Sequence, residues 1–157
     1  MQGFQGKIVV VTGAGGGMGR AYARAFARRG ARLALNDWDA QALEETVGLV
    51  GGDGATEVHA AAFDVGDRDA VYAFAAAVRE QFGNAHVIIN NAGIEGSARP
   101  VWATEDTDFE RVMRINFFGV VHGTRAFLPQ LLENGEGAIV NISSVFGLMG
   151  TPNCADY

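Results

Sequence analysis

Short runs of apolar residues alternate with longer amphipathic segments along the chain. The short runs are rich in β-branched residues, and most lack the alternation of apolar and polar positions that marks a half-buried strand. Continuous runs of this kind are typical of parallel strands that helices cover on both faces. The sequence therefore predicts five buried strands, at residues 7–12, 32–36, 57–63, 86–90 and 138–142.

The segments between these runs have the apolar spacing of helices. A first helix begins near Met18, with apolar residues on one face and arginines on the other, and Gly30 is suited to cap its C-terminus. A third helix has the same period, and its apolar face consists of Val71, Phe74, Ala75, Val78 and Phe82. A further helix is expected over residues 105–132, after a long loop at residues 94–103. Alternating strands and helices predict an α/β fold with a doubly wound parallel sheet of the Rossmann type.

Composition limits the class of protein. The chain has 157 residues, of which 48% are hydrophobic and 19% charged, and this suffices for one domain with a buried core. Its net charge of −6 argues against binding to nucleic acid, which requires a basic surface. We find no signal peptide and no apolar run of about 18 residues that could span a membrane. With Cys154 as the single cysteine, we expect a cytoplasmic protein without nucleic-acid or membrane partners.

A glycine-rich turn joins the first predicted strand to the first helix. Its residues are Thr12, Gly13, Ala14, Gly15, Gly16, Gly17, Met18 and Gly19. Glycines at this point permit a tight turn and let backbone N–H groups approach a pyrophosphate at the helix N-terminus. A glycine cluster can also be an ordinary turn, but the strand before it and the helix after it are the context that a dinucleotide site requires. We therefore interpret the turn as a nucleotide-binding site.

Asp37 lies at the end of the second predicted strand. A carboxylate there can accept hydrogen bonds from the ribose hydroxyls of adenosine, and it would repel the 2′-phosphate of NADP. Neither Gly16 nor Trp38 offers a basic side chain for that phosphate, so the expected cofactor is NAD(H). The alternative is that Asp37 or Asp39 only caps a helix that begins near Ala40. We assign the cap to Asp39 and the ribose contact to Asp37.

Together with Asn90-Asn91-Ala92-Gly93 and the serines at residues 143–144, these motifs resemble those of the classical short-chain dehydrogenase/reductase family over the whole chain. The resemblance implies an NAD-dependent oxidoreductase that transfers a hydride between NAD(H) and a small alcohol or carbonyl substrate. It also implies that residues 1–157 form an NAD-binding Rossmann domain, and that the intact protein is a homodimer or homotetramer. The implied cofactor contacts are Thr12, Gly13, Gly17, Met18, Gly19, Asp37, Asp64, Val65, Asn91, Ala92 and Gly93.

The same resemblance implies a catalytic set of Asn116, Ser144 and Tyr157. Asn116 would hold a water of the proton relay, although an amide on an apolar helix face can also be a structural core group. Ser144 is preferred over Ser143 because its interval of thirteen residues to Tyr157 resembles the spacing in the family. Ser144 would donate a hydrogen bond to the substrate oxygen, and Tyr157 would be the general acid and base.

One feature of the family is missing. A phenol with an ordinary pKa of about 10 needs a neighbouring cation to work near neutral pH, and the family supplies a lysine four positions after the tyrosine. Here Tyr157 is the last residue, and the single lysine, Lys7, opens the first strand. We therefore expect a C-terminally truncated chain whose sheet is incomplete at the C-terminus and which is inactive alone. The alternative is a fragment or pseudoenzyme that binds NAD without turnover.

Two other features are less informative. The histidines are scattered without the spacing of metal ligands, so no metal site is predicted; they are His59, His86 and His122. The helix expected over residues 105–132 has more apolar positions than one face of a sheet needs, among them Phe117, Phe118 and Phe127. Core packing and a helix-to-helix dimer interface explain these phenylalanines equally well.

Overall fold

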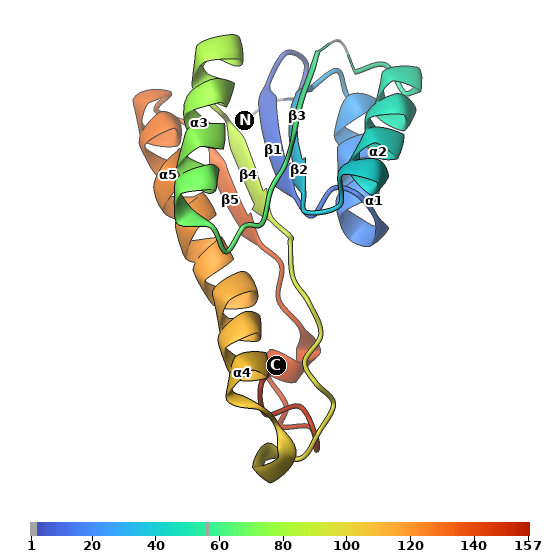
Figure 1. Ribbon diagram of the computed structural model, residues 1–157. Coiled ribbons are helices and arrows are strands. Elements are labelled where there is room, and N and C mark those ends of the chain that lie inside the picture. The colour runs from blue at the N-terminus through green and yellow to red at the C-terminus, as the bar shows by residue number, and fades with distance from the viewer. Residues whose placement is uncertain (1–2, 56) are drawn as a thin grey trace.

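A parallel sheet forms the centre of the computed structural model, which describes residues 3–55 and 57–157 (Figure 1). Its five strands have the order β3-β2-β1-β4-β5, and every neighbouring pair is parallel. The strands are β1 (Ile8–Thr12), β2 (Arg32–Asp37), β3 (Val58–Ala62), β4 (Val87–Asn90) and β5 (Ala138–Asn141). The predicted doubly wound α/β fold of the Rossmann type is confirmed.

Helices cover the sheet on both faces (Figure 1). α1 (Gly17–Ala27) and α2 (Ala40–Gly52) lie on one face, and α3 (Arg68–Phe82) and α5 (Gly119–Glu133) on the other. Side chains alternate between the faces along a strand, so Val9 belongs to one core and Val10 to the other. All five apolar positions predicted for the third helix are buried in α3.

The order of the strands fixes where a ligand can bind. β1 lies between β2 and β4, and the chain reverses its direction of winding between β1 and β4. The crevice outside the carboxyl ends of the strands at such a reversal is the usual ligand site of an open α/β sheet. The segments that leave β1 after Thr12 and β4 after Asn90 meet at this crevice.

The helix predicted over residues 105–132 is not regular. It consists of α4 (Asp106–Val112), a π-helical segment η2 (Met113–Phe118) and α5. The backbone N–H of Gly119 donates to the carbonyl of Arg114, five residues earlier, as in a π-helix. Such single-turn π segments are frequent at functional sites. A short helix, η1 (Val101–Ala103), lies in the predicted loop at residues 94–103.

β3 and β5 differ from the prediction that every strand is buried, because they are the two edge strands of the described sheet and none of their residues is buried. β5 pairs with β4. Ile139, opposite Ile88, packs on the core beneath α3 and α5. Val140 points to the other face of the sheet, where it is 41% exposed. The three apolar residues of β5 therefore have one covered face, to which Ile139 belongs.

Two smaller predictions concern single residues. Gly30 follows α1 with a positive φ, its N–H donates to the carbonyl of Ala27, and the N–H of Ala31 donates to the carbonyl of Phe26, so the predicted glycine cap at the C-terminus of α1 is confirmed. Of the three phenylalanines, Phe127 is buried in the core, whereas Phe117 and Phe118 are about half exposed. Core packing explains Phe127 only, and an interface role for the other two stays a prediction. No helix in the described part of the chain is long and apolar enough to cross a membrane.

Candidate functional site

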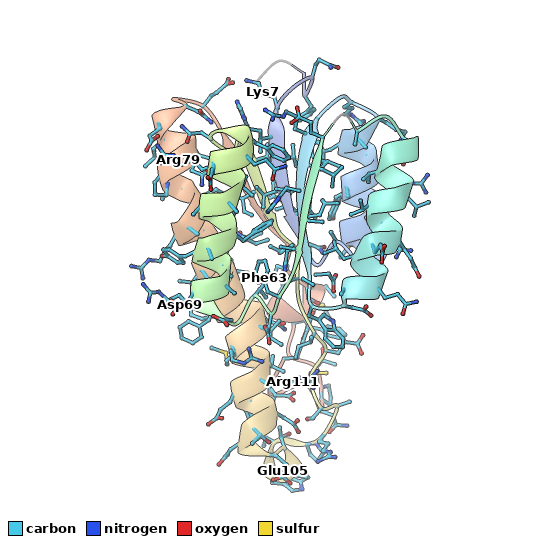
Figure 2. The ribbon with its side chains drawn as sticks, turned by 45° about the horizontal axis from the view of Figure 1, so that its top comes forward. Lys7, Phe63, Asp69, Arg79, Glu105 and Arg111 are labelled. Atoms are coloured by element: carbon cyan, nitrogen blue, oxygen red, sulfur yellow. The ribbon has the colours of Figure 1, made fainter. Side chains whose placement is uncertain are left out.

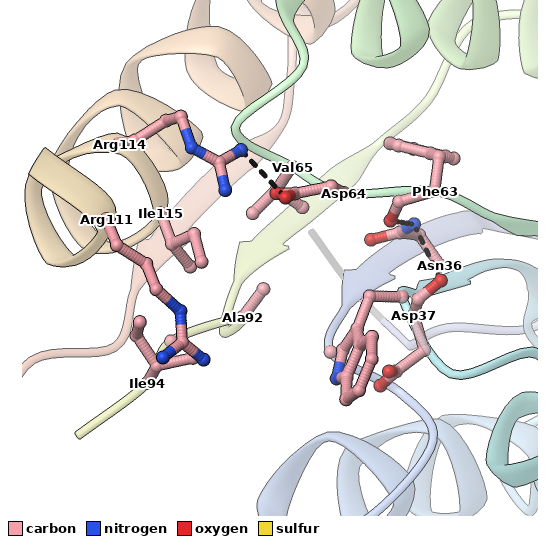
Figure 3. A pocket seen from close by; sticks show the side chains of 13 residues that line it. Asn36, Asp37, Phe63, Asp64, Val65, Ala92, Ile94, Arg111, Arg114 and Ile115 are labelled. Atoms are coloured by element: carbon pink, nitrogen blue, oxygen red, sulfur yellow. Dashed lines mark hydrogen bonds and ion pairs between the residues drawn. The ribbon is translucent and has the colours of Figure 1, made fainter. Parts of the chain in front are cut away.

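Two adjoining pockets open at the carboxyl ends of the strands. The first has a volume of about 470 Å³ and is lined by Asp37, Trp38, Asp64 and other residues (Figure 3). The second has a volume of about 430 Å³ and includes Ser144 and Tyr157. Both are lined by the segment at residues 92–94, so they meet there. Three predicted site residues line neither pocket, namely Thr12, Gly17 and Gly19.

The glycine-rich turn packs closely against the segment after β4. Gly13 has a φ of +66°, and a Cβ on it would lie 2.8 Å from the Cα of Ala92, so only glycine fits. A Cβ on Gly19, in the first turn of α1, would overlap the carbonyl oxygen of Gly13. These two glycines therefore allow the start of α1 to lie directly beside the end of β4.

The N-terminus of α1 is open in a way that the next two helices are not. Its N-cap is Gly16, without a side-chain cap, and no acidic residue lies in its first turn. Asp39 caps α2 and Asp67 caps α3, each accepting hydrogen bonds from two backbone N–H groups. The first N–H groups of α1 are therefore available to an anion. The assignment of the α2 cap to Asp39 is confirmed.

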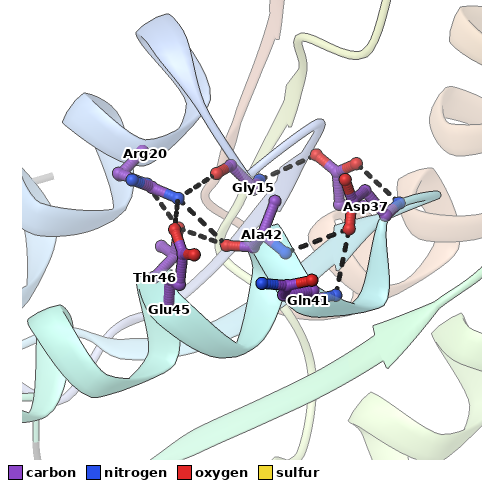
Figure 4. Close-up of polar contacts among 8 residues, drawn as sticks. Gly15, Arg20, Asp37, Gln41, Ala42, Glu45 and Thr46 are labelled. Atoms are coloured by element: carbon purple, nitrogen blue, oxygen red, sulfur yellow. Dashed lines mark hydrogen bonds and ion pairs between the residues drawn. The ribbon is translucent and has the colours of Figure 1, made fainter.

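Asp37 is buried at the end of β2, with 8% of its surface exposed. Its Oδ2 accepts a hydrogen bond from the Gly15 N–H at 2.7 Å, and its Oδ1 accepts one from the Asp39 N–H at 3.0 Å (Figure 4). Each carboxylate oxygen can accept a second hydrogen bond, so ribose hydroxyls could still bind. The structure thus brings Asp37 to the glycine-rich turn and to the wall of the first pocket.

Thr12 and Asn91 join the ends of β1 and β4. The Oγ1 of Thr12 accepts hydrogen bonds from the backbone N–H groups of Asn91 at 3.0 Å and Ala92 at 3.1 Å. The Nδ2 of Asn91 donates to the carbonyls of Thr12 at 2.9 Å and Gly13 at 3.2 Å. Thr12 therefore acts on the site through the backbone that it fixes, since it does not line a pocket itself.

The far wall of the first pocket carries an ion pair (Figure 3). Asp64 accepts a hydrogen bond from the Gly66 N–H at 2.7 Å and another from Nη1 of Arg114 at 2.7 Å. This pair ties the turn after β3 to η2. Arg111 also lines the pocket. Neither arginine could be predicted from the sequence, because helical spacing alone does not show that this helix passes along the carboxyl edge of the sheet.

Asn116 lies in the π-helical segment η2 and holds one residue of the next loop. Its Oδ1 accepts from the Ile94 N–H and its Nδ2 donates to the Ile94 carbonyl, both at 2.9 Å. The amide thus satisfies both backbone groups of Ile94, as a structural polar group does. Asn116 also lines the second pocket. Its role in holding a water stays a prediction.

Ser144 and Tyr157 line the second pocket together. Ser144 is the N-cap of the short helix η3 (Val145–Gly147), and its Oγ accepts from the Phe146 N–H at 3.2 Å. Its hydroxyl proton is left for another acceptor. The ring of Tyr157 packs edge-on against Phe146, with 6.2 Å between the ring centroids. Ser143 lines the same pocket, so this geometry does not separate the two serines.

Asp156, next to Tyr157, is a residue that the sequence analysis missed. Its carboxylate is 4% exposed, and its Oδ2 accepts a hydrogen bond of 2.6 Å from the Ser97 N–H. This hydrogen bond holds the pKa of Asp156 below its usual value. Gly96 lies so close to the carboxylate that a Cβ there would overlap it. Asp156 therefore ties the loop at residues 94–103 to the segment with Tyr157, a contact that no local sequence pattern indicates.

The histidines have separate surroundings. His59 stacks on Phe74 with 5.5 Å between ring centroids, and His122 lies with its Nδ1 3.2 Å from the Val65 carbonyl oxygen. The Nδ1 of His86 accepts a hydrogen bond from a backbone N–H, and partial burial lowers the pKa of this histidine. Within residues 3–55 and 57–157, no group of three or more His, Cys, Asp or Glu residues could hold a metal ion.

Lys7 lies at the amino edge of the sheet. It precedes β1 and forms an ion pair with Glu136, which precedes β5. Figure 2 shows Lys7 at the end of the molecule opposite Arg111, which lines the first pocket. Lys7 therefore lies far from Tyr157, which lines the second pocket at the carboxyl edge.

Known proteins resemble the chain along most of its length. A family model described as short chain dehydrogenase matches residues 7–157. The Mycobacterium tuberculosis (strain ATCC 25618 / H37Rv) protein named "Putative oxidoreductase SadH" is 46% identical over 157 residues, which make up 100% of this chain and 56% of that protein. The 2-(R)-hydroxypropyl-CoM dehydrogenase of Xanthobacter autotrophicus is 40% identical over 153 residues, which make up 96% of this chain and 61% of that protein.

Solved structures give the same picture. A short chain dehydrogenase/reductase from Burkholderia phymatum in complex with NAD is 40% identical and superimposes with a TM-score of 0.95, over 100% of this chain and 56% of that one. An NAD+-bound xylitol dehydrogenase is 38% identical with a TM-score of 0.94, over 98% of this chain and 59% of that one. The chain thus spans less than two thirds of each of these relatives.

Proposed function

Since this chain belongs to the short-chain dehydrogenase family, we propose that the whole protein is an NAD-dependent oxidoreductase acting on an alcohol or carbonyl compound of low molecular mass. The observation that carries the proposal is the pair of adjoining pockets at the carboxyl edge of the sheet, where the direction of winding reverses between β1 and β4. One includes the carboxylate of Asp37, and the other includes the hydroxyls of Ser144 and Tyr157. A nucleotide site and a site for proton transfer thus lie side by side.

The residues of the first pocket fit the adenosine half of NAD. Asp37 has acceptors for the ribose hydroxyls, and Val65 and Ile115 offer apolar surface for the base. The open N-terminus of α1 fits the pyrophosphate. Asp37 favours NAD over NADP, because a 2′-phosphate would meet its negative charge. Both similar structures contain bound NAD, which supports the same choice. In this proposal residues 1–157 act as the NAD-binding domain.

The second pocket fits the reacting end of the cofactor and the substrate. Bound NAD(H) supplies or accepts the hydride. Tyr157 gives a proton to the carbonyl oxygen during reduction and takes one from the alcohol during oxidation. Ser144 donates a hydrogen bond to the same oxygen. Asn116 fixes the backbone at Ile94 and holds a water of the proton relay.

A second candidate function is nucleotide binding without turnover by these 157 residues alone. It is favoured by the placement of Lys7, which pairs with Glu136 at the amino edge of the sheet. A phenol acts as an acid and base near neutral pH only beside a cation, and Lys7 lies at the edge of the sheet opposite the pocket that includes Tyr157. Homo-oligomerisation of the whole protein and a location in the cytoplasm also belong to the proposal, and both stay predictions.

Hydride transfer by the whole protein tests the enzymatic proposal. Supplied with NAD and a series of secondary alcohols, it should form NADH, detected by absorbance. Tyr157→Phe removes the acidic proton but keeps the ring, so it should abolish turnover while NAD still binds. Tyr72→Phe is the matched control, because Tyr72 lies on α3 away from both pockets. NADH formation by Tyr157→Phe at the unsubstituted rate would remove Tyr157 from its role.

A further inference from the structure

We propose that Arg20 is a positioning residue for the pyrophosphate of the cofactor, because it fixes the orientation of the backbone at Gly15. The inference rests on the proposed function, in which the glycine-rich turn binds NAD. Arg20 does not line either pocket. It therefore acts through the turn and not by contact with the ligand.

The guanidinium of Arg20 links the glycine-rich turn to α2 (Figure 4). Its Nη2 donates to the carbonyl of Gly15 and to the carbonyl of Ala42, the latter at 3.1 Å. Its Nε donates to Oγ1 of Thr46 at 2.8 Å, and Glu45 lies 3.0 Å from Nη2. The side chain is only 29% exposed. Acceptors from two elements thus hold the planar group in one orientation.

Gly15 is held by charged side chains at both of its backbone groups. Its N–H donates to Oδ2 of Asp37 at 2.7 Å, and its carbonyl accepts from Arg20. Hydrogen bonds to charged groups are about twice as strong as those between neutral groups. Rotation of either peptide beside Gly15 would break the hydrogen bond to Asp37 or the one from Arg20. Asp37 and Arg20 therefore hold Gly15 from opposite sides, one at its N–H and the other at its carbonyl.

The turn needs this support because it has little rigidity of its own. Gly15, Gly16 and Gly17 follow one another, and glycine loses more conformational freedom on ordering than any other residue. A side chain at Gly15 is not an alternative, since a Cβ there would lie 2.8 Å from Oδ2 of Asp37. The neighbouring side chains must therefore provide the order that the glycines lack.

An anion site requires N–H groups directed at the ligand and carbonyl oxygens directed away from it. Arg20 binds the Gly15 carbonyl on the α2 side and so keeps this oxygen from the negatively charged phosphates. Without Arg20 the turn would sample other orientations, and binding would have to order it at a cost in affinity. Loss of Arg20 should therefore weaken the binding of the phosphates more than that of adenosine, which contacts residues of the first pocket.

The competing explanation is that Arg20 only ties α1 to α2. Arg24 offers a matched control, because it also joins these two helices. Its Nε donates to Oδ2 of Asp53, the C-cap of α2, at 2.6 Å. Among the hydrogen bonds of the described residues, the Arg24 side chain donates to Asp53 and not to the glycine-rich turn. A purely structural role would make substitutions of Arg20 and Arg24 equivalent.

The test is isothermal titration calorimetry of the whole protein with ADP-ribose and with adenosine. Arg20→Met should weaken ADP-ribose binding about tenfold and adenosine binding much less. Arg20→Lys should lose nearly as much, because an ammonium keeps the charge but cannot bind the same acceptors together. Thr46→Val, which removes only the partner of Nε, should weaken ADP-ribose about threefold. Arg24→Met should leave the ratio of the two affinities unchanged.

Several outcomes would overturn the inference. Equal losses for ADP-ribose and adenosine in Arg20→Met would show a structural role only, and full recovery in Arg20→Lys would show that charge alone matters. If Arg20→Met does not fold, Thr46→Val takes its place as the test. An unchanged ratio of ADP-ribose to adenosine affinity in Thr46→Val then counts against the inference. If the unsubstituted whole protein binds neither ligand, the proposed function itself fails. If the unsubstituted protein binds both ADP-ribose and adenosine, a contrary result for the variants counts against the role of Arg20 and not against the proposed function.

Discussion

The carboxylate of Asp156 accepts a hydrogen bond of 2.6 Å from the backbone N–H of Ser97, which lies 59 positions earlier in the chain. This single contact joins the loop after β4 to the residue that precedes Tyr157. It is buried, and it lies beside the second pocket rather than in it. The position of the proposed acid and base thus depends on a loop from another part of the sheet.

We predict that this contact makes stability dependent on pH in the acidic range. The hydrogen bond lowers the pKa of Asp156 in the folded chain below its ordinary value of 3.8. The ionised carboxylate therefore stabilises the fold above that value, and the contribution is lost as the pH falls through the lower, folded-state pKa. Asp156→Asn should unfold at a lower temperature than the unsubstituted chain at neutral pH, and the difference should shrink in acid.

Thermal unfolding followed by circular dichroism from about pH 7 to about pH 3 measures this difference. Asp69→Asn is the control, because the side chain of Asp69 is 93% exposed, and it should change the melting temperature little at any pH. A difference for Asp156→Asn that stays constant over the whole range would contradict the account.

A second prediction concerns the glycines of the turn. Gly19→Ala should destabilise the chain by about 1–3 kcal/mol and abolish NAD binding, because the new methyl group would push α1 away from the Gly13 carbonyl. Gly16 has extended backbone and nothing within 4 Å of a built Cβ. Gly16→Ala should therefore cost at most about 1 kcal/mol, from a poorer N-cap. Similar denaturant midpoints for the two variants would mean that the close approach at Gly19 is not needed.

A third prediction separates two amide side chains that each hold a loop. Asn116→Ala leaves the N–H and carbonyl of Ile94 without their partner and should cost about 1–3 kcal/mol. Hydrogen exchange at residues 94–103 should become faster. Asn134→Ala removes a similar bond of 2.9 Å to the Ala85 carbonyl, far from the pockets. It should lower stability without changing exchange at residues 94–103, and faster exchange there in both variants would argue against a local role for Asn116.

A fourth prediction tests whether Asp39 only caps α2 while Asp37 binds the ribose. Asp39→Ala removes the hydrogen bonds to the Gln41 and Ala42 N–H groups and should destabilise the chain by about 1 kcal/mol. The ratio of NAD to NADP affinity should not change, because Asp39 does not line the first pocket. Chemical denaturation and calorimetry measure the two effects, and a changed ratio would transfer the ribose assignment from Asp37 to Asp39.

The central strands and the face of α3 could be predicted because burial there follows local pattern. Val9, Val10 and Val11 form a continuous apolar run, and both sides of β1 are covered. Ala60 and Ala62 belong to a similar run in β3 but are exposed, because the position of a strand in the sheet is decided by pairing between distant segments. The apolar content of a strand therefore does not reveal whether it is central or at an edge.

The candidate site was predictable where it lies within one motif and unpredictable where it joins several. Asp37 and the glycine turn could be identified from their positions after strands. Arg114 and Asp156 could not, because each acts through a contact with a residue that is distant in sequence. Arg20 could not, because helical spacing does not show that its side chain also meets Ala42 and Thr46 on α2. The π-helical turn at Asn116 was also missed, since apolar spacing does not distinguish it from a regular helix.

The most direct test of the central claim is the calorimetric titration of NAD and NADP into the chain and into Asp37→Ala. The account predicts saturable binding of NAD, with NAD preferred over NADP, because Asp37 accepts from the ribose and repels a 2′-phosphate. Asp37→Ala should weaken NAD more than NADP and so reduce this preference, although loss of the Gly15 contact weakens both. Absence of saturable NAD binding, or an unchanged preference in Asp37→Ala, would contradict the account.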